Sequence, residues 1–469
     1  MTLTPTTLAE IDAACSAFAR EENIPGLVAG VVEDGKLAHV ATVGLADIEA
    51  KRPVSPETCF RIASMTKNMT ALAVLSLRDQ GKLALDAPYA DYVPQFAKMA
   101  LPTRDSPPLT LRQLLSHLGG QVYDDPWGDR VLGMTPAELD SVMEAGRLFA
   151  RPPGIAFEYS NLGYGLVGRA ITNVSGMPYQ SYIARTILEP LGMTRTTFDA
   201  IEASRGDYAW PYRLDGGQWS RERIEPDGEV GAMGGLATTV PDYARYVAFL
   251  LSAWPARDDP ETGPVRRASV REMGLFHAPP FAFDAERPSP PSAYGYGLNN
   301  TADPKVGRML HHAGGLPGYG SHVLMQPERG WGVMAFGNLT YAPMSRLSAR
   351  LIEIVHAACA APPAAAPSPF LVRAVEAVVA AYEAGRIETA ESACAVNFLL
   401  DTPAPFRNAE LAGLKQRLGD GRLEAIEPEH ALAGDFILIC AKGRLRGTII
   451  LSPEAVPGIQ KLTLTAEES

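Results

Sequence analysis

The sequence is poor in cysteine, and its cysteines follow no metal-binding or disulfide pattern. Five are scattered along 469 residues without a C-x-x-C pair, at Cys15, Cys59, Cys359, Cys394 and Cys440. An odd and scattered set disfavours both a disulfide framework and a zinc site. We therefore expect reduced thiols in a cytoplasmic protein.

Long hydrophobic runs and basic tracts are also absent. No apolar run is long enough to cross a bilayer, and the first residues have neither a basic start nor an apolar stretch, so we expect no signal peptide. The chain carries 42 Lys and Arg against 53 Asp and Glu, a net charge of −11. This balance disfavours nucleic acid and anionic membranes as partners.

Proline and alanine concentrate in residues 359–369, which predicts a linker between two domains. Before it, residues 1–358 are long enough to bury a large core. After it, residues 370–469 show helical periodicity first and then strand-like runs at 436–440, 448–451 and 459–464. We expect this part to be a small α+β domain without a catalytic or metal-binding cluster.

The first domain mixes helical and strand patterns. Runs rich in β-branched residues at 26–32 and 36–43 flank Asp34-Gly35, which predicts a hairpin. Loops are expected at about 255–293. Further runs predict three antiparallel strands that complete the same sheet, at 308–312, 321–325 and 332–337. Helices are predicted to pack against the sheet at 6–22, 64–81 and 344–358. The sequence thus predicts an α+β fold.

Ser64 and Lys67 stand three residues apart at the start of a predicted helix, so their side chains share one face. A serine hydroxyl becomes a good nucleophile when a base takes its proton, and lysine can be that base once its pKa is lowered, for example by burial. An S-x-x-K pattern also arises by chance in a chain of this length. The alternative is a surface Ser and Lys on an amphipathic helix.

Three short patterns follow one another along the chain: Ser64-Met65-Thr66-Lys67, Tyr159-Ser160-Asn161 and His312-Ala313-Gly314-Gly315. Together they resemble the motifs of the serine β-lactamase and penicillin-binding-protein superfamily. The chain is most similar to its class C branch, with the β-lactamase-like carboxylesterases, D-aminopeptidases and D,D-carboxypeptidases. The resemblance covers about residues 10–357. It implies a β-lactamase/transpeptidase-like α/β sandwich, in which an antiparallel sheet is flanked by helices beside a helical region.

The resemblance implies a chemical role for the first two motifs. Ser64 would attack an ester or amide carbonyl and become acylated. Lys67 and Tyr159 would share the work of the base, and we expect nearby positive charge to favour the Tyr159 phenolate. For Tyr159 alone, a tyrosine of the hydrophobic core is the alternative.

The remaining motif residues would bind the substrate. Asn161 would donate its amide to the substrate carbonyl, and a helix cap is its alternative. The backbone N–H groups of Ser64 and Gly315 would form the oxyanion hole. His312 and Gly314 would contact the substrate, with His312 in the place of the lysine usual in this motif. A hydrogen-bonded strand histidine is the alternative for His312.

Other polar residues lie near these motifs in the sequence. His117 ends a helix as in the family, which implies a structural hydrogen bond to a loop beside the site, although the T-S-G that usually follows is missing here. We expect four residues on the acyl-binding side of the site: Tyr123, Asp124, Asp125 and Trp127.

The pair His311-His312 does not predict a metal site, because adjacent residues of a strand face opposite ways. No H-E-x-x-H pattern accompanies it. We expect neither a metal nor a cofactor.

The leading hypothesis is a serine hydrolase that acts through an acyl-enzyme on small esters or amides, with a β-lactamase-like carboxylesterase first. The alternatives are a cytoplasmic peptidase or amidase similar to the D-aminopeptidases, a weak β-lactamase, and a catalytically idle scaffold or binding protein of the same fold. For the C-terminal domain two roles stay open, homo-oligomerisation and capping of the active site.

Overall fold

The computed structural model describes residues 3–146, 148–279, 290–358 and 366–468. By their contacts the residues form two compact units, Met1–Ala361 and Pro362–Ser469. The predicted linker at 359–369 lies mostly outside the described residues. Each unit is described by itself below.

The first unit is built on an eight-stranded sheet in which every neighbouring pair of strands is antiparallel. Its centre joins the N-terminal hairpin to strands from near residue 330. In spatial order the strands are β3 (Arg52–Pro53), β2 (Lys36–Asp47), β1 (Gly26–Glu33), β12 (Trp331–Gly337), β11 (Tyr319–Gln326), β10 (Gly307–Leu316), β9 (Asn299–Asp303) and β8 (Ser292–Tyr294).

The predicted hairpin is confirmed. Asp34 and Gly35 both have positive φ angles, of 49° and 73°, and β1 pairs with β2 around them. β1 is buried at every position except Glu33, because helices cover both faces of the sheet. This double cover explains why β1 reads as a nearly continuous apolar run.

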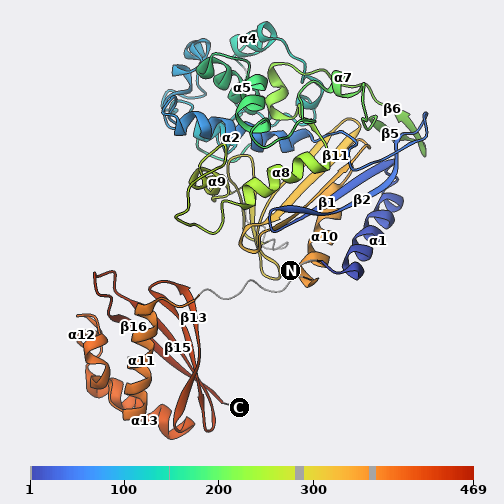
Figure 1. The fold of residues 1–469 in the computed structure, drawn as a ribbon. Coiled ribbons are helices and arrows are strands. Elements are labelled where there is room, and N and C mark those ends of the chain that lie inside the picture. Colours follow the sequence, from blue (N-terminus) through green and yellow to red (C-terminus); the bar gives the residue numbers. More distant parts are fainter. Residues whose placement is uncertain (1–2, 147, 280–289, 359–365, 469) are drawn as a thin grey trace. The chain divides into compact units, whose positions relative to one another are not determined.

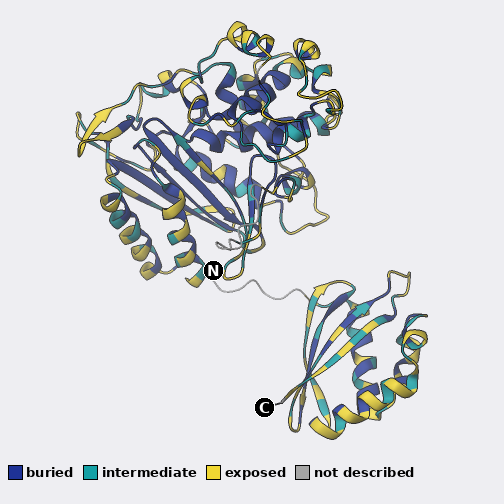
Figure 2. Ribbon diagram, turned by 180° about the vertical axis from the view of Figure 1, so that it is seen from behind, coloured by how far each residue is buried: buried dark blue, intermediate teal, exposed yellow. Residues whose placement is uncertain are grey.

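Helices form a layer on each face of the sheet (Figure 1). On one face lie α1 (Pro5–Glu21) and α10 (Met344–Ala358), which share a hydrophobic cluster with β1 and β12. On the other lie α8 (Val240–Leu251) and α2 (Thr66–Asp79), in the larger cluster that also fills the helical region. Figure 2 shows the outer faces of α1 and α10 exposed and the sheet between the layers buried. The predicted helices at 6–22 and 344–358 are confirmed.

The helical region packs against α2. It contains α3 (Leu111–Leu115), α4 (Pro136–Glu144), α5 (Asn161–Ser175), α6 (Tyr179–Ile183), α7 (Ala200–Ala203) and α9 (Arg267–Met273). Two short strand pairs lie nearby: β4 (Phe60–Arg61) with β7 (Ala237–Thr238), and β5 (Tyr212–Asp215) with β6 (Gln218–Arg221). The β4–β7 pair leads directly into the turn that carries Ser64.

The second unit has the predicted α+β composition. A four-stranded antiparallel sheet packs against three helices over its own hydrophobic cluster. The elements are α11 (Pro369–Ala384), α12 (Phe398–Asp401), α13 (Ala404–Leu418), β13 (Gly421–His430), β14 (Ala433–Cys440), β15 (Gly443–Leu451) and β16 (Ile459–Glu468).

The sequence analysis missed the short strands β3, β4, β5 and β6, and it also missed β8, β9 and β13, which lie at or next to a sheet edge. β13 is an edge strand with many exposed charged side chains and Pro428, which an edge tolerates because no ladder hydrogen bond is lost. β8 and β9 form the other edge of the large sheet, in and after a stretch expected to be loop. In addition, β10 extends beyond the predicted strand at 308–312 to Leu316.

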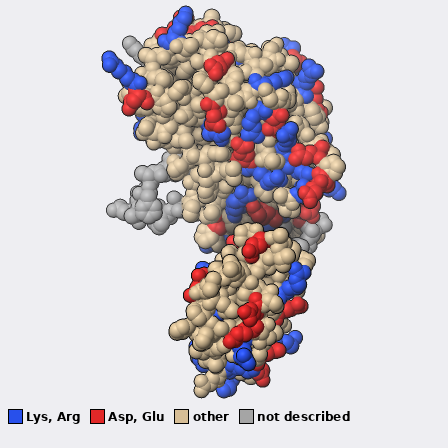
Figure 3. Space-filling model, turned by 90° about the vertical axis from the view of Figure 1, so that its left-hand side faces the viewer, with Lys and Arg blue, Asp and Glu red and all other residues tan. Residues whose placement is uncertain are grey.

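The observed architecture is a mixed fold in which an eight-stranded antiparallel sheet is flanked by helices, beside a small C-terminal α+β unit. This confirms the predicted fold class. Among the described residues, no helix has the length and apolar character needed to span a membrane. On the face shown in Figure 3, Lys and Arg are interspersed with Asp and Glu.

Candidate active site

Ser64 lies in a single 3-10 turn, Ala63–Met65, that leads directly into α2. The residue before it, Ala63, has a φ of 49°, in the left-handed region that costs a non-glycine residue energy. The turn is held by its neighbours: the Ile62 N–H donates to the Leu236 carbonyl, and the Ser321 hydroxyl donates to the Ile62 carbonyl at 2.7 Å. These contacts present the Ser64 side chain to a pocket.

Lys67 lies in the first turn of α2 and is fully buried. Its Nζ is 2.9 Å from Ser64 Oγ, 2.7 Å from Asn161 Oδ1 and 2.9 Å from the Met233 carbonyl oxygen. Burial lowers the pKa of Lys67 to about 8, against the opposing charges of Asp125, Asp129 and Asp124. At pH 7 about a tenth of this amine is therefore uncharged, far more than for a lysine in water, and the fraction reaches about half at pH 8.

Asn161 is the first residue of α5, but it is not the cap of this helix. Ser160 is, since its hydroxyl accepts from the Gly163 N–H at 3.1 Å. The side chain of Asn161 faces the site instead: its oxygen accepts from Lys67, and its amide nitrogen donates to Asp125. Because a carboxylate can only accept, this contact assigns the amide orientation.

Asp124 and Asp125 are adjacent in the chain, but their carboxylates have different contacts. Asp124 is buried and accepts the backbone N–H groups of Asn161 at 2.7 Å and Leu162 at 2.6 Å. It therefore secures the start of α5 and does not line the pocket, contrary to the sequence-based expectation. Asp125 lines the pocket together with Tyr123, as expected, whereas the exposed Trp127 does not.

Tyr159 is partly buried and lines the pocket, and the Lys67 amine lies 4.9 Å from its ring centre. Burial, followed by the charge of Asp125, raises the pKa of Tyr159 well above its usual value, and a side-chain hydrogen bond with Ser64 opposes this. The expectation of an easily formed phenolate is therefore wrong. In the resting site Tyr159 holds its proton.

His312 lies in β10 and is buried. Its Nδ1 is 2.5 Å from the Ala313 carbonyl, so this nitrogen carries the proton, and the Tyr294 hydroxyl then donates to Nε2 over 2.8 Å. Burial, and secondarily the charge of Lys67, lowers the pKa of His312 to about 3. The imidazole is therefore neutral at neutral pH.

The two glycines that follow His312 in β10 differ in what they contact. Gly315 lines the pocket together with Ala313. Gly314 does not: a Cβ there would lie 2.2 Å from the Ile62 carbonyl oxygen and 2.3 Å from Ser321 Oγ. Gly314 lets the strand approach the turn that carries Ser64, and a contact between its backbone and the substrate stays a prediction.

His117 has the structural place that the sequence predicts. Its Nδ1 accepts the Ser160 N–H at 3.2 Å, and its carbonyl accepts the Glu158 N–H at 2.9 Å. Its ring also stacks at an angle against Tyr159, with 4.3 Å between the ring centres. It thereby holds the segment that carries Tyr159 and Asn161.

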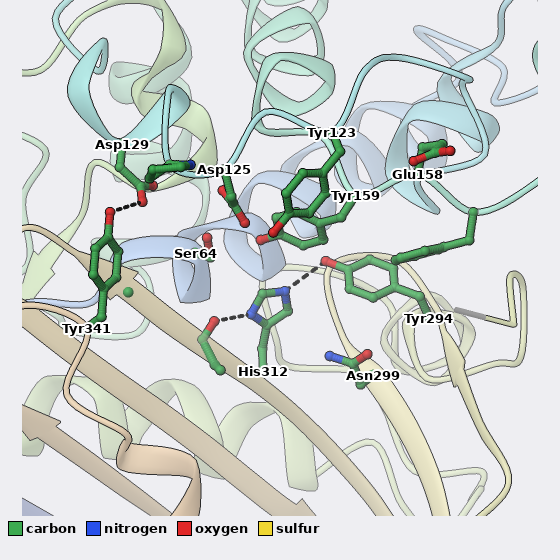
Figure 4. Close-up of a pocket in the computed structure, with 14 residues that line it drawn as sticks. Ser64, Tyr123, Asp125, Asp129, Glu158, Tyr159, Tyr294, Asn299, His312 and Tyr341 are labelled. Atoms are coloured by element: carbon green, nitrogen blue, oxygen red, sulfur yellow. Dashed lines mark hydrogen bonds between the residues drawn. The ribbon is translucent and has the colours of Figure 1, made fainter. Parts of the chain in front are cut away.

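The pocket that Ser64, Tyr159 and His312 line is a cavity of about 720 Å³ (Figure 4). Its wall includes residues that the sequence analysis missed because no motif marks them: Asp129, Tyr294, Asn299 and Tyr341. Asp129 follows Asp124 and Asp125 closely in the chain, and that run of acids was the one available signal. Within the described residues, no group of three or more His, Cys, Asp or Glu is placed to hold a metal ion.

The fold and the Ser64–Lys67 pair define a protein of the serine β-lactamase and penicillin-binding-protein class. The chain belongs to the beta-lactamase family, whose family model matches residues 11–357. At the level of the family, this membership supports a serine hydrolase.

Two curated relatives resemble this chain in sequence. Protein flp of Staphylococcus aureus (strain MW2) is 28% identical over 338 residues, which are 71% of this chain and 64% of that protein. The chain thus spans about two thirds of that relative's length. Esterase EstB of Burkholderia gladioli is 29% identical over 375 residues, 72% of this chain and 92% of that protein.

Two solved structures share the fold. The octameric penicillin-binding protein homologue from Pyrococcus abyssi has a TM-score of 0.65 at 22% identity and covers 98% of both chains. The class C beta-lactamase from Rhodobacter sphaeroides has a TM-score of 0.58 at 23% identity, covering 74% of this chain and 99% of its own. The first similarity extends through the C-terminal unit.

Proposed function

We propose that this protein is a serine hydrolase that acts through an acyl-enzyme on Ser64, with small carboxylic esters as its first substrate class and small amides as its second. The contact between Lys67 and Ser64 carries the proposal. Asn161 Oδ1 and the Met233 carbonyl can only accept hydrogen bonds, so an uncharged Lys67 donates its two protons to them. Its lone pair is then directed at Ser64 Oγ, 2.9 Å away.

In the proposed reaction, Lys67 takes the proton of Ser64 while the serine oxygen attacks the substrate carbonyl. The backbone N–H groups of Ser64 and Gly315 stabilise the oxyanion. Tyr159 gives its phenolic proton to the leaving alcohol or amine and is restored by the proton on Lys67. Hydrolysis of the acyl-enzyme by water runs the same transfers in reverse and frees the acid.

The uncharged state of His312 favours esters over β-lactams. A β-lactam carries a carboxylate, and a neutral imidazole offers it no ion pair. The similarity to a protein named as an esterase supports the same order. Peptidase or amidase activity of the D-aminopeptidase kind is the second candidate.

The deciding experiment combines a covalent probe with a substrate panel. A fluorophosphonate should add its mass to Ser64, and p-nitrophenyl acetate or butanoate should be hydrolysed. Ser64→Ala should lose at least about a thousandfold in kcat/KM while staying folded. Ser141→Ala, at an exposed serine of α4, is the matched control. Full turnover by Ser64→Ala would refute the acyl-enzyme.

We also propose that the chain forms a homo-oligomer through residues 370–469. The structurally similar Pyrococcus abyssi protein is octameric, and the likeness includes this unit. Several large apolar side chains of the unit are exposed: Val396, Leu400, Phe406 and Val456. Light scattering should find the full chain larger than a monomer and a chain ending at residue 360 monomeric. A monomeric full chain would contradict this.

A further inference from the structure

The wall of the pocket is acidic. Among the described residues that line it are three carboxylates, Asp125, Asp129 and Glu158, and neither Lys nor Arg. Glu158 forms an ion pair with Arg151. The other two carboxylates have no ion pair with Lys or Arg within the part of the chain that the structure describes. The pocket therefore holds negative charge that no basic side chain of its wall balances.

Asp129 is the more unusual of the two. Only 4% of it is exposed, and the contact found for its carboxylate is the Tyr341 hydroxyl, which donates to Oδ2 at 3.0 Å. Burial, and then the charge of Asp125, raises the pKa of Asp129 to about 7. A buried carboxylate without a cation is costly, so such a group at the wall of a reactive pocket indicates a ligand that supplies the charge.

Lys67 does not serve as that cation. Its amine attracts both carboxylates, but its contacts go to Ser64, Asn161 and the Met233 carbonyl. In the proposed reaction Lys67 must also be uncharged when it takes the serine proton. In that state Lys67 no longer offsets the charge of Asp125 and Asp129.

The positions of Asp125 and Asp129 relative to Ser64 indicate that they face the acyl part of the substrate. In Figure 4, Asp125 and Asp129 lie on one side of Ser64, and His312 and Asn299 lie on the other. Asp125 also accepts the amide of Asn161. The acidic wall is therefore on the side of Asn161, the residue expected to meet the acyl carbonyl.

We propose that the pocket selects substrates whose acyl group carries a protonated amine, and that Asp125 and Asp129 are the specificity-determining residues that pair with it. This inference rests on the proposed acyl-enzyme function and names its substrate class as amino-acyl esters or amides. The ammonium group replaces the missing cation, with charged hydrogen bonds to both carboxylates. An anionic acyl group is repelled by the same wall.

The test compares two acyl groups of equal length on the full chain. The p-nitrophenyl esters of 3-aminopropanoic acid and butanoic acid differ by an ammonium in place of a methyl group, and the matching p-nitroanilides test the amides. After subtraction of spontaneous hydrolysis, kcat/KM should be about tenfold or more higher for the amino-acyl member, the size expected for a charged hydrogen bond.

Substitutions of the carboxylates that line the pocket then show which of them causes the preference for the amino-acyl substrate. Asp129→Asn should reduce the ratio of amino-acyl to neutral kcat/KM by about tenfold. Glu158→Gln removes a carboxylate that Arg151 already pairs, so it should leave this ratio within about twofold. If Asp129→Asn does not fold, inhibition of the wild-type chain decides: propylammonium should compete with the butanoate ester at least about tenfold more strongly than propan-1-ol.

The outcomes separate this inference from the function beneath it. A probe-labelled Ser64 with a ratio of one or less, or no advantage of propylammonium over propan-1-ol, overturns the amine preference and leaves the acyl-enzyme standing. Failure of all four substrates together with an unlabelled Ser64 overturns the proposed function, and this inference with it.

Discussion

Lys67 shows how burial turns a surface residue type into a base. Its amine has no exposed surface, and desolvation brings its pKa down to about 8 even though three carboxylates act against the shift. Tyr159 moves the other way and keeps its proton. The two groups thus start the reaction in opposite states, one able to accept a proton and the other to donate one.

The pH profile should report the titration of Lys67. Because only the uncharged amine can take the serine proton, kcat/KM for p-nitrophenyl butanoate should rise about tenfold per pH unit below pH 8 and level off above it. Tyr159→Phe should be slower but keep the rise at the same pH, since the phenol titrates far higher. A flat profile between pH 6 and 9 would exclude Lys67 as the titrating base.

His312 gives a prediction about substrate charge. A lysine at this position would supply a cation for a β-lactam carboxylate, where the neutral imidazole supplies none. We expect ester turnover well above nitrocefin turnover, and His312→Lys should shift the ratio toward nitrocefin by roughly ten- to thirtyfold. His312→Gln, which stays neutral, should not. Faster hydrolysis of nitrocefin than of esters by the wild type would reverse the proposed order.

At the scale of elements, the contact between β10 and the Ser64 turn decides the geometry of the site. Gly314 permits it, because any side chain at this position meets the Ile62 carbonyl and the Ser321 hydroxyl. The same short stretch carries His312 before it and Gly315 after it. Strand and nucleophile are thus held at a separation that one extra carbon would change.

Gly314→Ala should therefore damage both stability and activity. Insertion of a methyl group against backbone costs about 1–3 kcal/mol in the free energy of unfolding and should push the oxyanion site away from Ser64. Urea unfolding and p-nitrophenyl butanoate turnover measure the two effects. Gly206→Ala is the control: the nearest atom to its added Cβ is 3.7 Å away, so its stability should change by less than about 0.5 kcal/mol. Equal stability of the two variants would show that the contact is not tight.

At the scale of the whole molecule, the two units have separate hydrophobic cores. The clusters of the first unit use residues up to Val355, and that of the second begins at Leu371. The described residues that line the pocket all belong to the first unit. We therefore expect the first unit to fold and react by itself.

Removal of residues 361–469 should accordingly leave Ser64 reactive. A chain ending at residue 360 should fold and take up the fluorophosphonate at a rate within about threefold of the full chain, because the hydrophobic clusters of the first unit consist of its own residues. The same truncation with Ser64→Ala should take up none. Limited proteolysis of the full chain should cut near 359–369. A folded but unreactive truncated chain would show that the second unit helps to build the site.

How far the sequence predicts the site differs from residue to residue. Ser64 and Lys67 could be paired because their spacing on a helix is local, and the order of the three motifs pointed to the family. Tyr294 and Tyr341 could not be found, because they reach the pocket from a strand and a loop without a shared pattern, and Asp129 had only the nearby acids Asp124 and Asp125 as a signal. The protonation of Tyr159 was mistaken for a similar reason: desolvation depends on everything packed around the phenol.

By itself, the sequence determined the hairpin, the helices at both ends of the first unit, the antiparallel sheet and the serine–lysine pair, since each depends on periodicity or spacing over a few residues. It did not determine β8, β9 and β13, which lie at or next to a sheet edge, because these strands are short or largely polar and lack the alternation of apolar residues that marks a strand. Only the tertiary structure decided which side chains share the pocket and which of them are charged. Both depend on distances between segments and on exclusion of water, which arise when the sheet and the helical region pack together.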